Sequence, residues 1–243
     1  MRFSYSRVGC FAQCPKKYQF QYVDHLKTIP KQNADNALYL GLALHKGIEE
    51  WSVEAAVNEY KSHYNIITDN HINWIMQIEY QLPKVLDILP PGGEHELEVK
   101  TPGFIGYVDY VCGNTMYDFK YSNNVENYKK SSQLSIYRHY LSLVRPDLHI
   151  EHTKFLMVPK VNIRQKKNET IIEFRQRLKE NLDATEIKLI EVPYSEESVT
   201  QFQEACQILE TVDEFPKNKT RLCAWCDFQS FCESDGEIDY MIL

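Results

Sequence analysis

The chain has 243 residues, with 27 Lys and Arg against 34 Asp and Glu, a formal net charge of −7, and 43% hydrophobic residues. This composition excludes a disordered chain, and the length is enough to bury a sizeable core. No run of about 18 apolar residues occurs, and the N-terminus lacks the apolar segment of a signal peptide, so we expect no membrane span and a cytoplasmic or nuclear location.

The first 90 residues have helical patterns. We expect a first helix over about 4–22 and a long second helix over about 38–64, where apolar residues recur at helical spacing. A third helix is expected over about 69–89. The Pro-Pro-Gly-Gly run at 90–93 ends this helical part of the chain.

Alternating strands follow, with a tight turn at Gly113-Asn114 between the second and the third. The strands are expected at 94–100, 104–112 and 115–121, and then a helix at 131–144, a strand at 153–158, a helix at 169–181, a strand at 187–192 and a helix at 195–212. The order of helix, three strands, helix and strand predicts an α/β fold with a mixed central sheet flanked by helices.

Charge is distributed unevenly along the chain. Residues 1–31 carry six Lys and Arg against one Asp, and residues 160–179 carry seven against two Glu. From Glu191 onward, twelve acidic residues face three basic ones. A local basic surface is therefore compatible with a net charge of −7, and binding of a polyanion there would be sensitive to salt.

Two carboxylates and a lysine occupy neighbouring strands. Asp118 and Lys120 are two residues apart on the third strand and share a face, and the hairpin brings Asp109 near that face. Adjacent carboxylates repel each other unless a proton or cation lies between them, and Mg²⁺ and Mn²⁺ prefer oxygen ligands. We therefore expect a divalent metal site, with Lys120 beside a bound water. The alternative is a surface hairpin with solvated charges, since Asp-x-Lys tripeptides are common.

Three polar residues accompany this pair of strands. His45, in Gly41-Leu-Ala-Leu-His45, lies on an apolar helical face, where a histidine is either a hydrogen-bonded core residue or a metal ligand. Gln133 and Tyr137 are four residues apart, so they share one face of the later helix. An amide and a phenol placed in this way can hold a phosphate or a base edge.

Three of the seven cysteines lie close together near the C-terminus. Cys223-Ala-Trp-Cys226 is followed by Cys232, and a tetrathiolate site needs a fourth ligand, for which Cys14 is the first candidate and Cys10 the alternative. Four thiolates bind zinc or an iron–sulfur cluster, and one remote cysteine with a trio favours the cluster. Such a site would join the N- and C-terminal parts of the chain.

Together these segments resemble the RecB-type branch of the PD-(D/E)xK nuclease superfamily, in the iron–sulfur form of the CRISPR-adaptation nucleases and the AddB nuclease domain. The matching segments are Ser4-Tyr5-Ser6 through Cys14-Pro15, Gly41 to His45, Gly106-Tyr-Val-Asp109, Asp118-Phe-Lys120, Gln133-Leu-Ser-Ile-Tyr137 and the cysteine trio. Each segment is weakly specific, whereas their order and spacing are highly specific. The resemblance implies a restriction-endonuclease-like α/β core with an iron–sulfur knuckle joining the two ends.

The resemblance also implies roles for individual residues. The metal, Mg²⁺ or Mn²⁺, would be held by His45, Asp109, Asp118 and the backbone carbonyl of Phe119. The catalytic residues would be Asp109, Asp118, Lys120, Gln133 and Tyr137. A structural [4Fe–4S] cluster would be held by Cys14, Cys223, Cys226 and Cys232. An upstream acidic residue of the family corresponds to Glu96 or Glu98, between which the spacing does not decide.

On this resemblance we expect a metal-dependent DNA exonuclease that acts on DNA ends, preferably single-stranded, in recombination, repair, replication or CRISPR spacer acquisition. The chain would form one nuclease domain over 1–243, with a helical part (1–93), a catalytic core (94–194) and a C-terminal cysteine region (195–243). No GxxxxGK[ST] loop occurs, so a helicase, recombination or CRISPR-adaptation protein would be a separate partner. A virus-encoded form would work in the host cytoplasm. The alternative is a non-catalytic DNA-end or partner-binding module with an iron–sulfur or zinc structural site.

Overall fold

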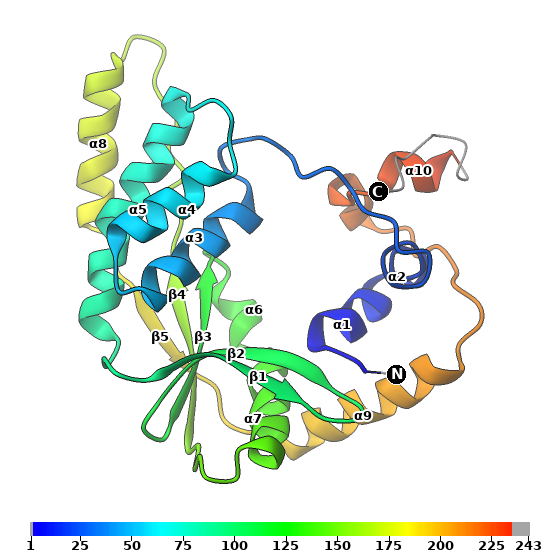
Figure 1. Ribbon diagram of the computed structural model, residues 1–243. Coiled ribbons are helices and arrows are strands. Elements are labelled where there is room, and N and C mark those ends of the chain that lie inside the picture. The colour runs from blue at the N-terminus through cyan, green and yellow to red at the C-terminus, as the bar shows by residue number, and fades with distance from the viewer. Residues whose placement is uncertain (1, 235–243) are drawn as a thin grey trace. The chain divides into compact units, whose positions relative to one another are not determined.

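The computed structural model describes residues 2–234, which form two compact units (Figure 1). The terminal unit comprises the described residues of 1–31, 100–106 and 195–243. The central unit comprises 32–99 and 107–194. The carboxylates, His45 and Lys120 of the predicted metal site lie in the central unit, whereas the cysteines proposed as cluster ligands lie in the terminal unit. None of the helices within 2–234 combines the length and apolarity needed to cross a membrane.

A mixed five-stranded sheet confirms the predicted α/β fold. The strands are β1 (Glu94–Lys100), β2 (Ile105–Cys112), β3 (Thr115–Tyr121), β4 (His152–Val158) and β5 (Lys188–Glu191). They lie in the order β1-β2-β3-β4-β5, with β3 and β4 parallel and the pairs β2–β3 and β4–β5 antiparallel. Gly113 has a φ of 58° in the turn between β2 and β3, as the Gly-Asn pair predicts.

Helices of the central unit surround this sheet. They are α3 (Ala37–Glu49), α4 (Val53–Ser62), α5 (Asp69–Ile88), α6 (Val125–Lys129), α7 (Gln133–Val144) and α8 (Ile171–Asp183). The main apolar core joins α3, α4 and α5 to one face of the sheet through buried residues such as Ile48, Leu82 and Phe119. The core therefore fixes α3, which carries His45, against the strands that carry the carboxylates.

The predicted long helix over 38–64 is wrong, because the chain breaks it into α3 and α4. Trp51 adopts a φ of 52°, which ends α3, and the hydroxyl of Ser52 then accepts a hydrogen bond from the backbone N–H of Ala55 at 3.1 Å. This N-cap begins a new helix. The helical spacing of apolar residues continues across the break at Trp51, so this spacing alone did not indicate where α3 ends.

Buried polar side chains of α5 hold the segments next to β4 and α8. Gln77 accepts a hydrogen bond from the backbone N–H of Val161 at 2.9 Å, and its amide donates to the carbonyl of the same residue at 3.3 Å. Lys84 donates to the carbonyls of Leu182 (2.7 Å), Asp183 (3.0 Å) and Thr185 (2.9 Å) at the end of α8. These bonds satisfy backbone groups that a helix end leaves without partners.

The terminal unit brings the two ends of the chain together. Its helices are α1 (Tyr5–Gln13), α2 (Pro15–Tyr18), a π-helical turn (Gln19–Val23), α9 (Glu196–Thr211), a 3₁₀ turn (Arg221–Trp225) and α10 (Gln229–Glu233). The predicted single helix over 4–22 is interrupted at Cys14, whose extended backbone suits a residue before proline.

Contacts between these ends are polar and aromatic. The backbone N–H of Lys16 donates to the carbonyl of Pro216 at 3.2 Å, and the amide of Asn218 donates to the carbonyl of Gln13 at 2.9 Å. The ring of Phe20 packs against Phe228 and Phe231, with centroid distances of 5.6 and 5.0 Å. The N-terminal helices therefore contact the cysteine-rich segment directly.

Candidate metal and cysteine sites

The backbone pairing of β2 and β3 ends beside the predicted carboxylates. Its register runs from Cys112 opposite Thr115 to Tyr110 opposite Tyr117. Beyond that pair, the backbone N–H of Phe119 donates to the Oδ2 of Asp109 at 2.7 Å. A side-chain carboxylate thus takes the position of a strand carbonyl, and this bond fixes Asp109 beside the strand that carries Asp118.

Three potential metal ligands meet at this point. His45 Nδ1 lies 3.2 Å from Glu96 Oε1, and His45 Nε2 lies 3.6 Å from Asp109 Oδ2. One ligand atom from each of the three residues lies within 4.8 Å of the others. An imidazole and two carboxylates form a donor set that suits a divalent cation such as Mn²⁺ or Mg²⁺. The predicted ligands His45 and Asp109 are thus close together.

Glu96, rather than Glu98, is the acidic residue of β1 that reaches His45. Glu96 has a φ of 48°, an unusual backbone conformation for a residue with a side chain, and lies within the strand. Glu98 instead accepts a 3.4 Å hydrogen bond from the hydroxyl of Tyr107. Glu96 and Glu98 are two residues apart, so both would point to the same face of an ideal strand. The alternation of the sequence therefore did not distinguish them.

Asp118 and Lys120 form an ion pair next to this group. Lys120 Nζ contacts Asp118 Oδ2, and the amide of Gln133 donates to Asp118 Oδ1 at 2.5 Å. Only 10% of the Asp118 side chain is exposed, so these two partners replace water around a buried carboxylate. Tyr137, the other residue predicted in α7, lies one helical turn beyond Gln133.

Aromatic rings position the lysine. Lys120 Nζ lies 5.8 Å from the ring centres of both Tyr128 and Phe155. Phe155 lies opposite Asp118 in the parallel register of β3 and β4. No local sequence pattern indicates Phe155, because its place beside Lys120 depends on the register of a distant strand.

The site has more negative charge than its own cations balance. Burial and the neighbouring Asp118 raise the pKa of Asp109 to about 7, although His45 opposes the shift. Burial alone would lower the pKa of His45, but its hydrogen bond to Glu96 and the charge of Asp109 raise it. A divalent cation held by these side chains would displace protons from them, because such ligands bind metal in the deprotonated form.

The cysteine site lies in the terminal unit. Cys14, Cys223 and Cys226 line one cavity of about 130 Å³. Burial raises the pKa of Cys232, Lys217 lowers it, and the charges of Cys14, Cys226 and Cys223 raise it further, which indicates that all four thiols are near one another. Within residues 2–234, the His45 group is the one set of three or more metal-binding side chains whose ligand atoms all lie within 4.8 Å of one another, so no three of these thiols meet that spacing.

The alternative cysteine has a different neighbour. Cys10 Sγ lies 3.9 Å from the side-chain oxygen of Gln21, and Cys10 is not among the residues that line the cavity. Burial nevertheless raises the pKa of Cys10. The charge of Lys17 lowers this pKa, and the charges of Cys14 and Cys226 raise it further. Both cysteines therefore lie in the same region, with Cys14 facing the cavity.

The sequence profile described as the PD-(D/E)XK nuclease superfamily matches residues 2–233. The chain belongs to this superfamily. Membership in the PD-(D/E)XK nuclease superfamily implies metal-dependent hydrolysis of phosphodiester bonds and DNA as the substrate. The group formed by His45, Glu96 and Asp109 is an acidic site that can hold the metal.

Solved structures and curated proteins give two further comparisons for this PD-(D/E)XK chain. A solved structure titled "Crystal structure of SSO0001" is similar to it, with a TM-score of 0.35 and 16% sequence identity. The similarity covers 90% of this chain and 93% of that one. Among curated proteins, the sequence comparison finds no match to this PD-(D/E)XK chain.

Proposed function

We propose that this chain is a RecB-type, metal-dependent DNA exonuclease that acts on the ends of single-stranded DNA. The observation that carries the proposal is the meeting of His45, Glu96 and Asp109 beside the Asp118–Lys120 ion pair. A structural hairpin has no need for an imidazole, three carboxylates and a lysine in one place. Such a group suits a phosphodiesterase, because it can hold a cation and still supply an ammonium to the reacting phosphate.

His45, Asp109, Asp118 and the carbonyl of Phe119 are the proposed metal ligands, and Glu96 joins them. The meeting of His45, Glu96 and Asp109 supports these three members of the set, as does the pKa of Asp109, which burial and Asp118 raise to about 7 and a cation would lower. When bound, the divalent ion lowers the pKa of a coordinated water and polarises the scissile phosphate.

Lys120 is the proposed residue that orients the attacking water. Burial alone would lower its pKa, but Asp118 raises it, so the ammonium form is retained beside the carboxylates. Asp118 and the rings of Tyr128 and Phe155 limit its movement. Gln133 holds Asp118 from the opposite oxygen, and Tyr137 on the same helix is proposed to contact the DNA strand.

A [4Fe–4S] cluster held by Cys14, Cys223, Cys226 and Cys232 is proposed as a structural element of the terminal unit. The shared cavity of Cys14, Cys223 and Cys226 supports it. Burial and the charges of Cys14, Cys226 and Cys223 raise the pKa of Cys232, which supports a position of this fourth thiol near the other three.

Single-stranded ends and a separate partner complete the proposal. The partner would be a helicase, recombination or CRISPR-adaptation protein that supplies DNA ends. The processes proposed for this activity are spacer acquisition, recombination, replication and repair.

The test is cleavage of end-labelled single-stranded and duplex DNA with Mg²⁺ or Mn²⁺. We expect terminal nucleotides to be released from single strands, and Asp118→Ala and Lys120→Ala to lower the rate by about 100-fold or more. Glu96→Ala should lose most activity, whereas Glu98→Ala, its matched control on the same strand, should retain it. Full activity of purified Asp118→Ala, or binding of DNA ends without any cleavage, would contradict the proposal.

A further inference from the structure

A polar cleft lies in the central unit, outside the metal site. It has a volume of about 800 Å³ and is lined by residues of α5, α8 and the segments 32–35 and 161–165. Its volume lies within the range of about 300–1,000 Å³ that is typical of small-molecule sites. The partly exposed indole of Trp74 lines the cleft and packs on Tyr121, the residue after Lys120, at a centroid distance of 6.3 Å. The cleft is therefore next to the strand that carries Asp118 and Lys120.

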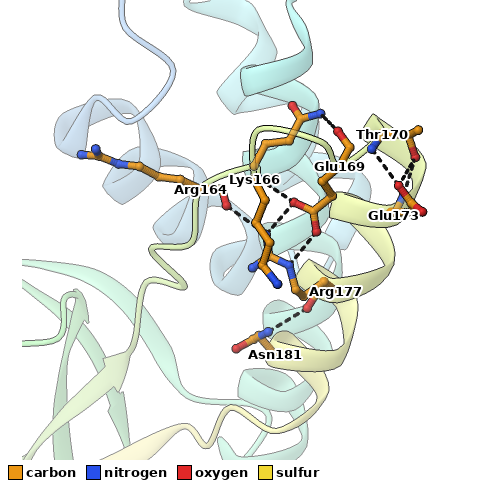
Figure 2. Close-up of polar contacts among 8 residues, drawn as sticks. Arg164, Lys166, Glu169, Thr170, Glu173, Arg177 and Asn181 are labelled. Atoms are coloured by element: carbon orange, nitrogen blue, oxygen red, sulfur yellow. Dashed lines mark hydrogen bonds and ion pairs between the residues drawn. The ribbon is translucent and has the colours of Figure 1, made fainter.

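The loop at one side of the cleft, residues 159–170, is firmly held. The amide of Gln81 donates to the carbonyl of Pro159 at 2.5 Å, and Gln77 makes two hydrogen bonds to Val161. Arg177 pairs with Glu169 through two 2.7 Å bonds and donates to the carbonyl of Arg164 at 2.9 Å (Figure 2). A loop fixed in this way presents its side chains without losing backbone entropy when a ligand binds.

Four of the seven cations of 160–179 already have partners. Arg175 pairs with Asp69 at 2.7 Å and Arg177 with Glu169, while Lys160 and Lys179 lie over the rings of Tyr121 and Tyr80. The basic surface expected over residues 160–179 is thereby narrowed to three exposed residues. These three residues are Arg164, Lys166 and Lys167. Within the described part of the chain, their side chains make no hydrogen bond or ion pair.

Figure 2 shows the Arg164 side chain extending away from the Glu169–Arg177 pair. Arg164 also lines the cleft, so its guanidinium belongs to both the cationic loop and the cleft. Cations spaced along one loop suit successive phosphates of a nucleic-acid strand, to which they bind through charge rather than sequence.

The cleft itself offers amides. Gln32, Asn70 and Asn162 line it, and their side chains have no hydrogen bond to other residues within 2–234. A carboxamide combines one acceptor and two donors, the combination that pairs with the edges of nucleobases. Base edges are accessible in single strands, where proteins also stack bases on aromatic side chains such as tryptophan.

We propose that this cleft is a base-binding site for single-stranded DNA, with Arg164, Lys166 and Lys167 binding the adjoining phosphates. The inference rests on the proposed function, because it assigns a path to the strand whose end reaches the metal site. The nucleobase enters between α5 and the 159–170 loop, and Gln32, Asn70 and Asn162 contact its edge.

The test measures binding without cleavage, by fluorescence anisotropy of a labelled oligonucleotide in EDTA over a series of salt concentrations. Arg164→Gln/Lys166→Gln/Lys167→Gln should weaken binding about 10-fold at low salt and reduce the slope of log K against log salt by about 2, because each lost phosphate contact contributes about 0.7. The matched control Lys61→Gln/Lys188→Gln/Lys219→Gln removes the same charge from other exposed positions and should leave the slope unchanged.

The base contacts need a second variant. Asn70→Ala/Asn162→Ala should weaken binding of a normal oligonucleotide roughly 5-fold without changing the salt slope, and should have no effect on an oligonucleotide whose bases are removed. Equal losses on normal and abasic strands would overturn the base-binding role. Loop variants that lose no more affinity than the matched control would overturn the phosphate role.

A parallel cleavage assay with Mn²⁺ separates the two proposals. A chain that cleaves single strands but whose loop and amide variants bind like the wild type contradicts the inference alone. A chain that binds through these residues but cleaves no DNA contradicts the proposed function, and the cleft then remains a binding site.

Discussion

Asp109 is a carboxylate whose position depends on a backbone group and whose pKa depends on burial and on a neighbouring carboxylate. Its Oδ2 accepts the N–H of Phe119 at 2.7 Å, which favours the ionised form, while burial and Asp118 disfavour it. Burial and the like charge prevail, so the pKa is raised to about 7. As a proposed metal ligand, the same residue would exchange its proton for a divalent ion.

The sign of the pH effect follows from this raised pKa. Below the ordinary range for aspartate, the carboxyl is protonated in both the folded and the unfolded protein. As pH rises towards 7, the unfolded protein ionises first, so the free energy of unfolding of the metal-free protein should fall through this interval. Divalent ions must displace the proton, so their affinity should increase as pH rises through about 7.

We therefore predict that Mn²⁺ raises the melting temperature more at pH 8 than at pH 6, measured by thermal unfolding with and without the ion. Asp109→Asn keeps the size of the side chain but has no carboxylate, and it should reduce the Mn²⁺ effect strongly at both values. An Mn²⁺ shift that is equal at both values in the wild type would contradict a proton–metal exchange at Asp109.

Residue-scale prediction from the sequence succeeded for side chains whose geometry follows from one strand or helix. Asp118 and Lys120 share a face because strands alternate, and Gln133 reaches Asp118 from the start of a helix that follows. Glu96 required knowledge of a backbone φ of 48°, which glutamate rarely adopts. Phe155 required the register of a distant parallel strand.

At the scale of elements, α3 positions His45 because it packs closely against its neighbours. A Cβ added at Gly47 would meet the side chain of Leu82, lie 2.7 Å from the Cβ of Ala56 and lie 3.3 Å from the carbonyl of Ser52. Real side chains do not approach so closely, so this glycine permits the approach of α3 to α4 and α5. Gly41, on the same helix, has no such neighbour within 4 Å.

This contrast gives a matched pair of substitutions. Gly47→Ala should lower the free energy of unfolding by about 1–3 kcal/mol through overpacking. Gly41→Ala should raise it by up to about 1 kcal/mol, because alanine favours a helix interior more than glycine does. Urea denaturation followed by circular dichroism measures both, and a stabilising Gly47→Ala would contradict the close packing.

Element boundaries were predictable where a capping or turn residue marked them, as at the Gly113-Asn114 hairpin. They were not predictable where tertiary structure interrupted a continuous pattern. Trp51 fits the apolar spacing of a helix, yet its φ of 52° turns the chain so that α4 packs on α3. The pattern therefore placed Leu44 and Ile48 in the core, but it failed at Trp51, which is exposed and ends α3.

At the scale of the whole molecule, the prediction that N- and C-terminal segments meet is supported by contacts independent of any metal. Lys16 bonds to Pro216, and Phe20 packs on Phe228 and Phe231. In the sequence, only the spacing of the cysteines predicted that the N- and C-terminal segments meet. The composition of these segments did not indicate it.

The cavity-facing position of Cys14 distinguishes it from Cys10. We predict that Cys14→Ser abolishes an absorbance near 400 nm in anaerobically purified protein, whereas Cys10→Ser retains it, with iron and sulfide assays as the second measurement. Retention of the absorbance and iron by Cys14→Ser would assign the fourth position elsewhere. Zinc in place of iron in the wild-type protein would contradict the cluster.

The joining of the two ends also has a consequence for synthesis on the ribosome. Cys14 and Cys223 are separated by 223 − 14 = 209 residues, so Cys14 emerges well before its spatial neighbours exist. At about 5–20 residues per second, this delay is on the order of 10–40 s. All five strands precede Cys223 in the chain, so the sheet can assemble while translation continues. The N-terminal helices must wait, with their aromatic faces uncovered, until the last segment is translated.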